Sequence, residues 1–414
     1  MNPSLSAEKP GRLWMPISEL ICYAIVISVA FWFTGAGLIG DVVGIGSIGI
    51  VTLLFFFPIL HRKSSLIVPH KELLFAFVAI HVFSALFAPN LFSTNIALKT
   101  LTQVVFFVLL VNVIDSIETL SKMTRLLLIV TALSMAFLIY IYLVVFHSLF
   151  LGNAIESATR GGKNTLAYFL SAMFPFAYAR FFHRPGVLSF LVLGIIAFAD
   201  VYVFSRMSLL LMGLTILIMS LIGIRKKRYI GVVFVGLFGG ILLLGMTGFT
   251  IDDYMALKTP GSPMSQNSFL NTNLEETHRG TMILDGLNGF RERPLFGHGG
   301  GSFQINQFSR HGSYTVAHND YITMLFEFGL IGTLLFFGIV LGVLKDLWSV
   351  RHKIGRENAW LWEGFLASIV CLLIGLLFNN AYFTVIVWFM LAGGQYLALK
   401  TSLESLVETK DSLG

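Results

Sequence analysis

Long apolar stretches alternate with short polar segments along almost the whole chain. The apolar stretches are continuous and lack the two-residue alternation of barrel strands, so they predict helices. Each has about 18 residues or more, which is enough for an α-helix to cross a bilayer. The pattern therefore predicts an all-α polytopic membrane protein with about twelve transmembrane helices, at residues 15–34, 38–59, 70–88, 95–114, 121–147, 163–182, 186–203, 206–224, 229–248, 318–344, 359–379 and 381–399.

One extended polar segment, residues 249–317, interrupts this pattern. It is far longer than an ordinary connection, which favours a functional loop. Within it, "LEETHRGTMILDGLNGF" predicts a helix with acids in its first turn, and the following Pro294 and glycines end it. Its expected apolar stripe consists of Met282, Ile283, Leu287 and Phe290. We expect nine spans in residues 1–248, a loop over the active site in 249–317, three spans in 318–399 and a tail in 400–414.

Composition supports the membrane assignment. The chain is 56% hydrophobic and 12% charged, and its mean hydropathy is +0.81, whereas soluble domains carry about 25% charged residues. The basic flank and apolar start loosely imitate a signal peptide, but we expect a retained first span. Cys22 and Cys371 lie inside apolar stretches, so we expect them to be packing residues.

The net charge of +6 mostly reports topology. Nineteen of the 28 lysines and arginines fall on one side of the predicted spans. Because basic residues collect on the cytoplasmic side, both termini are expected there. We find no basic groove with aromatic platforms, so nucleic acid is not an expected partner.

The cations on the outer side run against this trend and need a reason. Arg160 and Lys163 precede or begin the sixth span, Arg206 begins the eighth, and Arg279 lies in the long loop. Lys99 has a simpler explanation, because its side chain can snorkel from a helix end. The planar fork of arginine suits phosphate oxygens, so converging arginines indicate a lipid-linked phosphate or diphosphate. A transporter for an anionic substrate explains them equally well.

His318 opens the segment "HNDYITMLFEFGLIG" at the outer end of the tenth span. Asn319 or Asp320 can cap this helix. A helix N-terminus disfavours a nearby positive charge, so the imidazole should be neutral and able to act as a general base. The alternative is a histidine that only caps the helix at the interface.

Two further features carry weaker hypotheses. "GHGGG", from Gly297 to Gly301, offers backbone amides for a phosphate, but it lacks the lysine of a P-loop, and a flexible turn is favoured. Glu327, nine residues after His318, would lie about 13 Å into the membrane on a continuous helix. It is either functional or a hydrogen-bonding residue between helices, and the second role is favoured.

Four stretches together resemble the O-antigen ligase family, which includes O-antigen polymerases and protein O-oligosaccharyltransferases. They are "TRGGKNTLAYFLSAMFPFA", "FSRMSLLLM", "HRGTMILDGLNGFRERPLFGHGGGSF" and "AHNDYITMLFEFGLIG". The resemblance implies a C-type glycosyltransferase architecture with a periplasmic loop over the active site. It also implies a polyprenyl-diphosphate-linked glycan donor, without nucleotide sugar, cofactor or required metal.

The resemblance also carries residue roles. His318 matches the family's loop histidine, Arg279 the loop arginine and Arg206 the arginine of the Ser-Arg pair, while Arg160 and Asn164 match a weaker motif. Met282 stands where members often have an aromatic residue. Substrate binding is expected from residues in or beside these stretches, namely Arg160, Lys163, Asn164, Arg291, His298, Asn319 and Tyr321.

The expected activity is that of an O-antigen ligase in the bacterial inner membrane. It would transfer a glycan from undecaprenyl diphosphate to a lipid A-core hydroxyl at the periplasmic face. His318 would be the base, Arg279 and Arg206 would stabilise the diphosphate, and the anomeric centre would invert. The site lacks the carboxylate pair of a glycosidase. The alternatives are an O-antigen polymerase with the same donor, or a transporter of an anionic substrate. A protein O-oligosaccharyltransferase is less favoured, because those members usually carry a further C-terminal domain.

Overall fold

The computed structural model describes residues 23, 66–90, 92–141, 144, 162–203, 205–223, 229, 278–312, 314–379, 382 and 384–411. These residues form helices, turns and loops and contain no strand, so the expectation of an all-helical protein is confirmed for them. The number of spans and the C-type glycosyltransferase architecture stay predictions. The helices are α3 (Lys71–Phe87), α4 (Ser93–Val113), α5 (Ile117–Tyr140), α7 (Gly162–His183), α8 (Val187–Tyr202), α9 (Arg206–Ile222), α12 (His278–Glu292), α13 (Ser302–His311), α14 (Asp320–Ser349), α15 (Ala359–Gly375) and α16 (Val385–Asp411).

Nine of the predicted spans coincide with helices of the described part, α3 to α5, α7 to α9 and α14 to α16. The other three, 15–34, 38–59 and 229–248, lie outside the described residues except for Tyr23 and Tyr229. In the described part α4, α5 and α14 are long and apolar enough to cross a membrane, and α8, α15 and residues 207–222 of α9 are shorter apolar helices.

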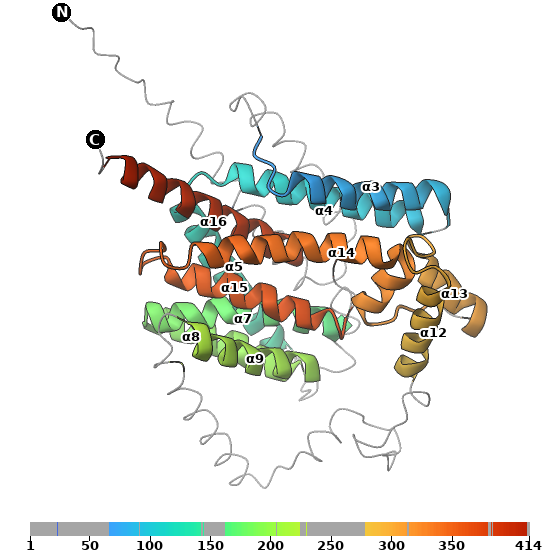
Figure 1. Ribbon diagram of the computed structural model, residues 1–414. Coiled ribbons are helices and arrows are strands. Elements are labelled where there is room, and N and C mark those ends of the chain that lie inside the picture. Colours follow the sequence, from blue (N-terminus) through green and yellow to red (C-terminus); the bar gives the residue numbers. More distant parts are fainter. Residues whose placement is uncertain are drawn as a thin grey trace, which may run out of the picture.

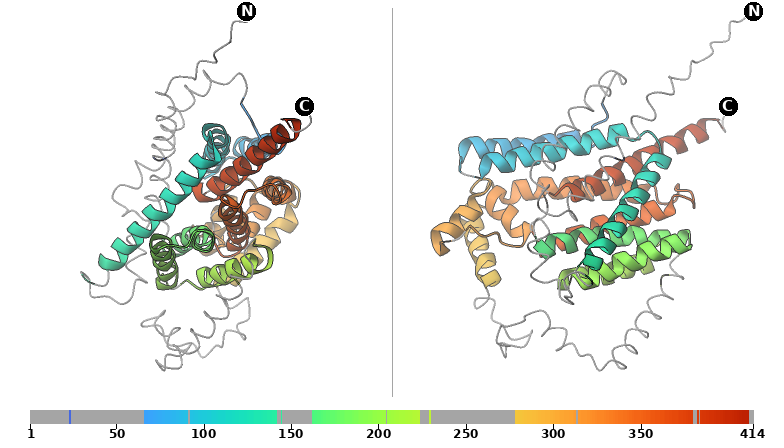
Figure 2. Two further views of the ribbon diagram at one scale, coloured as in Figure 1. Left: turned by 90° about the vertical axis from the view of Figure 1, so that its left-hand side faces the viewer. Right: turned by 180° about the vertical axis from the view of Figure 1, so that it is seen from behind.

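Most of these helices lie side by side in one bundle, and α12 and α13 cover one end of it (Figure 1). Helix α5 crosses the others obliquely, which is clearest in the two turned views (Figure 2). The centre is formed by α7 and α15, whose backbones come close because Gly364 faces the ring of Phe176 and Gly375 faces the ring of Tyr168. A Cβ atom on either glycine would lie 2.5 Å or less from the opposing ring.

Several helix ends differ from the predicted boundaries for identifiable reasons. Helix α5 begins four residues before the predicted span, because the Ser116 side chain caps it and accepts a hydrogen bond from the Thr119 amide at 3.0 Å. Helix α16 does not end near residue 399 but continues to Asp411, through most of the segment expected to be a tail. Residues 400–411 therefore extend the last helix, and the assignment of residues 400–414 to a cytoplasmic tail stays a prediction.

The loops meet in two groups at opposite ends of the bundle. At the end covered by α12 and α13, the amide of Asn379 reaches the carbonyl of Asn164 at 3.5 Å. At the other end, Lys353 donates to Ser405 at 3.1 Å. Each contact joins two segments that the charge count places on the same side of the membrane, the outer side for Asn379 and Asn164 and the inner side for Lys353 and Ser405. Which end faces the cytoplasm stays a prediction.

Candidate active site

The predicted tenth span is not a continuous helix. Gly329 has φ 62° and ψ −163° in the middle of α14 and breaks it into residues 320–328 and 330–349. The Tyr321 ring stacks on Phe337 with centroids 5.3 Å apart, although sixteen residues of straight helix would separate them by about 24 Å. The first half therefore folds back along the second, and the prediction of one helix over 318–344 is wrong.

This fold-back reverses the expected depth of His318 and Glu327. Asp320 and Tyr321 lie beside the end of α15, because the Asp320 amide donates to the Leu376 carbonyl at 2.8 Å and the Tyr321 hydroxyl to that of Leu373. Glu327 lies at the bend, next to the loop between α12 and α13. Residues 320–328, which we call the half-helix, therefore start further from the end covered by α12 and α13 than Glu327 does. The depth of Glu327 calculated for a straight helix does not apply.

The glycine-rich loop, residues 294–301 between α12 and α13, forms hydrogen bonds with the backbone groups that the break at Gly329 leaves without partners in the helix. The amides of His298 and Gly299 donate to the carbonyls of Phe326 and Glu327 at 2.9 and 2.8 Å. In return, the carbonyls of Pro294 and Leu295 accept from the amides of Leu330 and Ile331 at 2.8 and 3.2 Å. Because the Gly300 amide also donates to the Ser84 hydroxyl, these amides are engaged within the protein. The loop is thus a structural partner of α14 and not a free cradle for phosphate.

Glu327 connects the bend to the next helix of the loop. Its side chain is 2% exposed, and Oε1 accepts a hydrogen bond from the Phe303 amide at 3.4 Å in the first turn of α13. A carboxylate there satisfies amides that a helix N-terminus leaves unpaired. The geometry supports the role of a hydrogen-bonding residue between helices.

His318 has an unusual backbone conformation directly before the half-helix. Its φ is 50°, in the left-handed region that few residues other than glycine adopt. Two anchors fix the residues that follow: Asn319 caps the helix by accepting from the Ile322 amide at 3.2 Å, and Asp320 Oδ2 accepts from the Tyr382 amide at 2.9 Å. The expected cap by Asn319 is confirmed. Left-handed backbone held by its surroundings is often found at functional positions.

The structure brings the helix starts that carry the predicted cations to the region around His318. Lys163 and Asn164 begin α7, where the Asn164 carbonyl meets the turn after α15. Arg206 begins α9, and Leu211 in its second turn faces Gly375 at the end of α15.

Arg279 lies in the first turn of α12, three residues before Met282. Met282 packs in one apolar cluster with Ala317 and Ile322, which flank His318 in sequence. The side chains of Lys163, Arg206 and Arg279, and the whole of Arg160, lie outside the described residues. For Lys163, Arg206 and Arg279, the candidate site is therefore defined by the positions of their backbones.

Two glycines that the sequence analysis did not single out fix the position of α12. The buried face of α12 is centred on Met282, Gly286 and Gly289, whereas Ile283, Leu287 and Phe290 are only partly buried. A Cβ atom at Gly286 would lie 2.2 Å from the Ile322 side chain, and one at Gly289 would lie 2.1 Å from the Phe326 ring. The expected stripe was thus correct only at Met282. The spacing of Met282, Gly286 and Gly289 was the available signal, because it repeats with the helical period.

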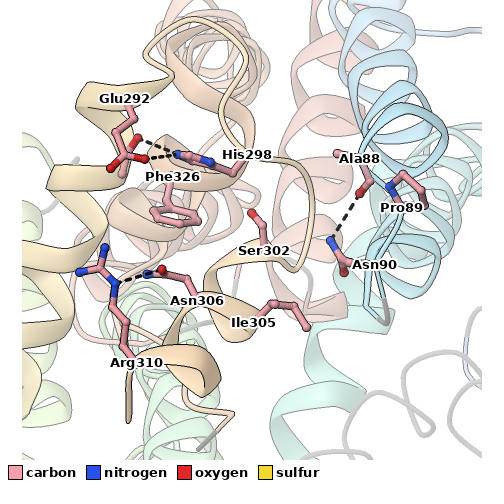
Figure 3. Close-up of a pocket in the computed structure, with 11 residues that line it drawn as sticks. Ala88, Pro89, Asn90, Glu292, His298, Ser302, Ile305, Asn306, Arg310 and Phe326 are labelled. Carbon is pink, nitrogen blue, oxygen red and sulfur yellow. Dashed lines mark hydrogen bonds and ion pairs between the residues drawn. The ribbon is translucent and has the colours of Figure 1, made fainter. Parts of the chain in front are cut away.

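A cavity of about 400 Å³, lined by both polar and apolar residues, lies on the α13 side of the glycine-rich loop (Figure 3). Among the expected site residues only His298 lines it. The His298 ring stacks on Phe326 with centroids 4.7 Å apart, and its Nε2 is 2.8 Å from the Gly289 carbonyl. These contacts connect α12 to α14. Arg291 is exposed near the end of α12 and does not line the cavity.

An ion-paired acid holds α12 and α13 together. Asp285 receives Arg310 at 2.7 Å and His311 and Gln307 at 3.1 Å each. Burial alone would raise the pKa of this carboxyl group, but the hydrogen bonds from His311 and Gln307 and the charge of Arg310 outweigh it and lower the pKa. The carboxylate form of Asp285 therefore favours the docked pair of helices.

The described helices and this site define the class of the protein, an all-α membrane protein with a broken helix under a two-helix loop. Residues 189–337 match the family model described as O-Antigen ligase. This match confirms, for that part of the chain, the resemblance to the O-antigen ligase family found in the sequence. It includes Arg206, Arg279 and His318, whereas Asn164 and Arg160 lie before it. A comparison with curated proteins gave no match. The match supports an O-antigen ligase- or polymerase-type function.

Proposed function

We propose that the protein is an O-antigen ligase of the bacterial inner membrane. It transfers a glycan from undecaprenyl diphosphate to a sugar hydroxyl of lipid A-core, with the active site on the periplasmic side and both termini in the cytoplasm. The observation that carries the proposal is the convergence of four chain positions around the end of α15. Lys163, Arg206 and Arg279 lie at the starts of α7, α9 and α12, near the turn at His318 that precedes the half-helix.

In this mechanism His318 accepts the proton of the acceptor hydroxyl while its oxygen attacks the anomeric carbon. The bond between that carbon and the diphosphate oxygen breaks, and undecaprenyl diphosphate leaves. Arg206 and Arg279 stabilise the negative charge that develops on the diphosphate. Attack from the face opposite the leaving group inverts the anomeric centre. No step requires a metal ion or cofactor. The further substrate contacts are assigned to Arg160, Lys163, Asn164, Asn319, Tyr321, Arg291 and His298.

The left-handed conformation of His318 fits this role. An imidazole that must meet a hydroxyl in a narrow range of positions benefits from a fixed backbone. The cap at Asn319 and the two contacts of Asp320 provide that fixation directly after His318.

A transporter is the alternative from another class, and the break at Gly329 is the observation that favours it. Transporters use broken helices, whose unpaired backbone groups bind substrate or ions. Here, however, the carbonyls of Phe326 and Glu327 and the amides of Leu330 and Ile331 already pair with the loop. The backbone groups at the break therefore hold the glycine-rich loop and are not free to bind a transported substrate.

The test is a transfer assay with purified protein, lipid-diphosphate glycan and lipid A-core in the presence of a chelator. Formation of glycosylated lipid A-core supports the ligase. Chain extension of the donor glycan without transfer to lipid A-core identifies a polymerase. If neither product forms, and the protein in vesicles moves the anionic donor or its free glycan phosphate, the transporter replaces the ligase.

Variants then test the residues. His318→Ala should lower transfer by about 100- to 10,000-fold while donor binding persists. Arg206→Ala and Arg279→Ala should weaken donor binding or turnover, with partial rescue by lysine, which keeps the charge but loses the fork. Transfer near the normal rate by His318→Ala would leave this histidine with a helix-capping role only.

A further inference from the structure

Three arginines gather at the end of the bundle opposite α12 and α13. Arg125 lies in the third turn of α5, Arg180 in the last turn of α7, and Arg184 directly after α7. They are close enough to repel one another, since the charge of Arg184 acts on Arg125 and both act on Arg180. In the described part of the chain, none of the three forms an ion pair.

The nearby acids are engaged by other groups. Glu118 pairs with Lys122 at 3.2 Å, although its charge still reaches Arg125. Glu363 is buried and contacts His183 at 3.1 Å and the Tyr229 hydroxyl.

Three buried donors in this region have no acceptor among the described residues. They are Nε of Arg125, Nη1 of Arg180 and Nε1 of Trp360. The guanidinium carbon of Arg180 is 5.1 Å from the centre of the Trp360 ring, and the charge of Arg125 acts on Arg180. Buried donors are nearly always hydrogen-bonded in proteins, so a group of three without acceptors calls for a missing acceptor.

Two general rules explain why cations lie here but not why their donors are unsatisfied. Arginines near the end of α7 favour the negative end of the helix dipole, and the cytoplasmic end of a membrane protein is expected to be basic. Neither rule requires charges to converge until they repel, or to bury donors without acceptors. A ligand that is negatively charged and offers several acceptor oxygens removes both costs.

We propose that this cluster binds the phosphate group of an anionic phospholipid. Helix α8 begins three residues after Arg184, and in its first turns Val187 is 78% exposed, Leu188 61% and Leu191 51%. An acyl chain along these residues places its phosphate at the arginines. A free phosphate ion would leave this apolar surface without a partner, which is why we assign a lipid. In the expected orientation the lipid belongs to the cytoplasmic leaflet.

The experiment measures lipid retention by the full-length protein, using native mass spectrometry after exchange into equal amounts of phosphatidylglycerol and phosphatidylcholine. We expect at least one phosphatidylglycerol molecule to remain bound in preference to phosphatidylcholine. Arg125→Gln and Arg180→Gln should each weaken its binding by about 10- to 100-fold, as expected for a lost charged hydrogen bond. Trp360→Phe keeps the ring and removes only the N–H group, so it should weaken binding by a smaller factor.

Arg351→Gln is the matched control. Arg351 lies at the same end of the bundle, also over a tryptophan, with its guanidinium carbon 4.8 Å from the Trp348 ring centre, but its Nη1 already donates to the Trp348 carbonyl at 3.1 Å. Its loss should leave lipid binding unchanged. The proposal fails if the protein shows no preference for phosphatidylglycerol, or if Arg351→Gln weakens binding as much as Arg180→Gln. It also fails if both Arg180→Gln and Trp360→Phe retain the lipid fully, or if millimolar inorganic phosphate displaces the lipid and thereby identifies a site for free anions.

Discussion

Replacing Gly329 by alanine should detach the glycine-rich loop from α14. Gly329 has φ 62° and ψ −163°, a conformation that is essentially restricted to glycine. A Cβ atom at this position would lie 2.4 Å from the Leu295 carbonyl oxygen and 2.7 Å from the Phe296 nitrogen. Both are backbone atoms, which cannot rotate away as a side chain can. The loop must therefore move, or α14 must change its bend.

The structure allows the cost to be divided into two parts. Backbone strain at a glycine-only conformation costs about 1–3 kcal/mol. Moving Leu295 also breaks the bonds from Leu330 to Pro294 and from Ile331 to Leu295, at about 0.5–1.5 kcal/mol each. The expected loss of stability is thus about 2–6 kcal/mol, and it should be concentrated at the bend.

Two glycines separate these contributions. Gly312 has φ 71°, but a Cβ atom there has nothing within 4 Å, so Gly312→Ala should cost only the strain of about 1–2 kcal/mol. Gly213 lies inside α9 with ordinary backbone and equally open space, so Gly213→Ala should be neutral or stabilise the protein by about 1 kcal/mol.

The measurement is thermal unfolding in detergent, combined with hydrogen exchange of peptides that cover residues 294–301 and 326–331. Gly329→Ala should unfold at the lowest temperature and lose protection in both peptides together. Glycan transfer should fall as well, because the bend positions the half-helix that begins beside His318. If Gly329→Ala matches Gly312→Ala in stability and both peptides keep their protection, the proposed pairing of loop and bend is wrong.

Three further predictions concern the loop helices and the topology. Gly289→Val should separate α12 from α14 and reduce transfer at least as strongly as His298→Ala, and a fully active variant would contradict the close contact with Phe326. Because the pKa of Asp285 is lowered, its contribution to docking of α12 on α13 is present above its ordinary pKa near 3.8 and is lost as the pH falls below that value. The distance between spin labels on the two helices should increase at such low pH. The same distance in Asp285→Asn should not change with pH. Cysteine labelling from the periplasm should modify a probe at Ser268 and not one at Lys226, and labelling of both from one side would overturn the orientation.

The sequence identified most helices of the described part but not the shape of α14. Continuous apolar residues determine where a helix lies because burial of the apolar surface dominates its stability. A bend depends on a single backbone conformation, and "FEFGLIG" places one glycine where many continuous membrane helices also carry one. The partner that makes the break stable, the loop at Pro294 to Gly299, lies about thirty residues earlier in the chain. Such a pairing of distant backbone groups leaves almost no pattern in either segment.

The candidate site was predictable in its residue types and not in its arrangement. Arg206, Arg279 and His318 stood out because they are polar groups at the ends of apolar segments, and this holds whatever the fold. Gly286 and Gly289 did not stand out, because a glycine is a packing residue only when a neighbour such as Ile322 or Phe326 occupies the space of its missing side chain. That neighbour belongs to the half-helix whose direction the sequence does not reveal.

The direction of the half-helix changes where the proposed chemistry takes place. On a straight α14, His318 would be the outermost residue and Glu327 the buried acid beneath it. In the folded-back arrangement Glu327 holds α13 at the bend, and the chain leads from there back to Tyr321 beside Phe337, about 12 Å along α14 from Gly329 at the usual helical rise. The proposed base thus lies directly before the half-helix, beside the starts of α7 and α9 and the end of α15, with α12 packed next to it. A diphosphate leaving group held between these helix ends would be less hydrated than at the open surface, so each arginine contact would stabilise its charge more strongly. The left-handed turn at His318 costs conformational energy, and in the proposed reaction it holds the base beside these helix starts.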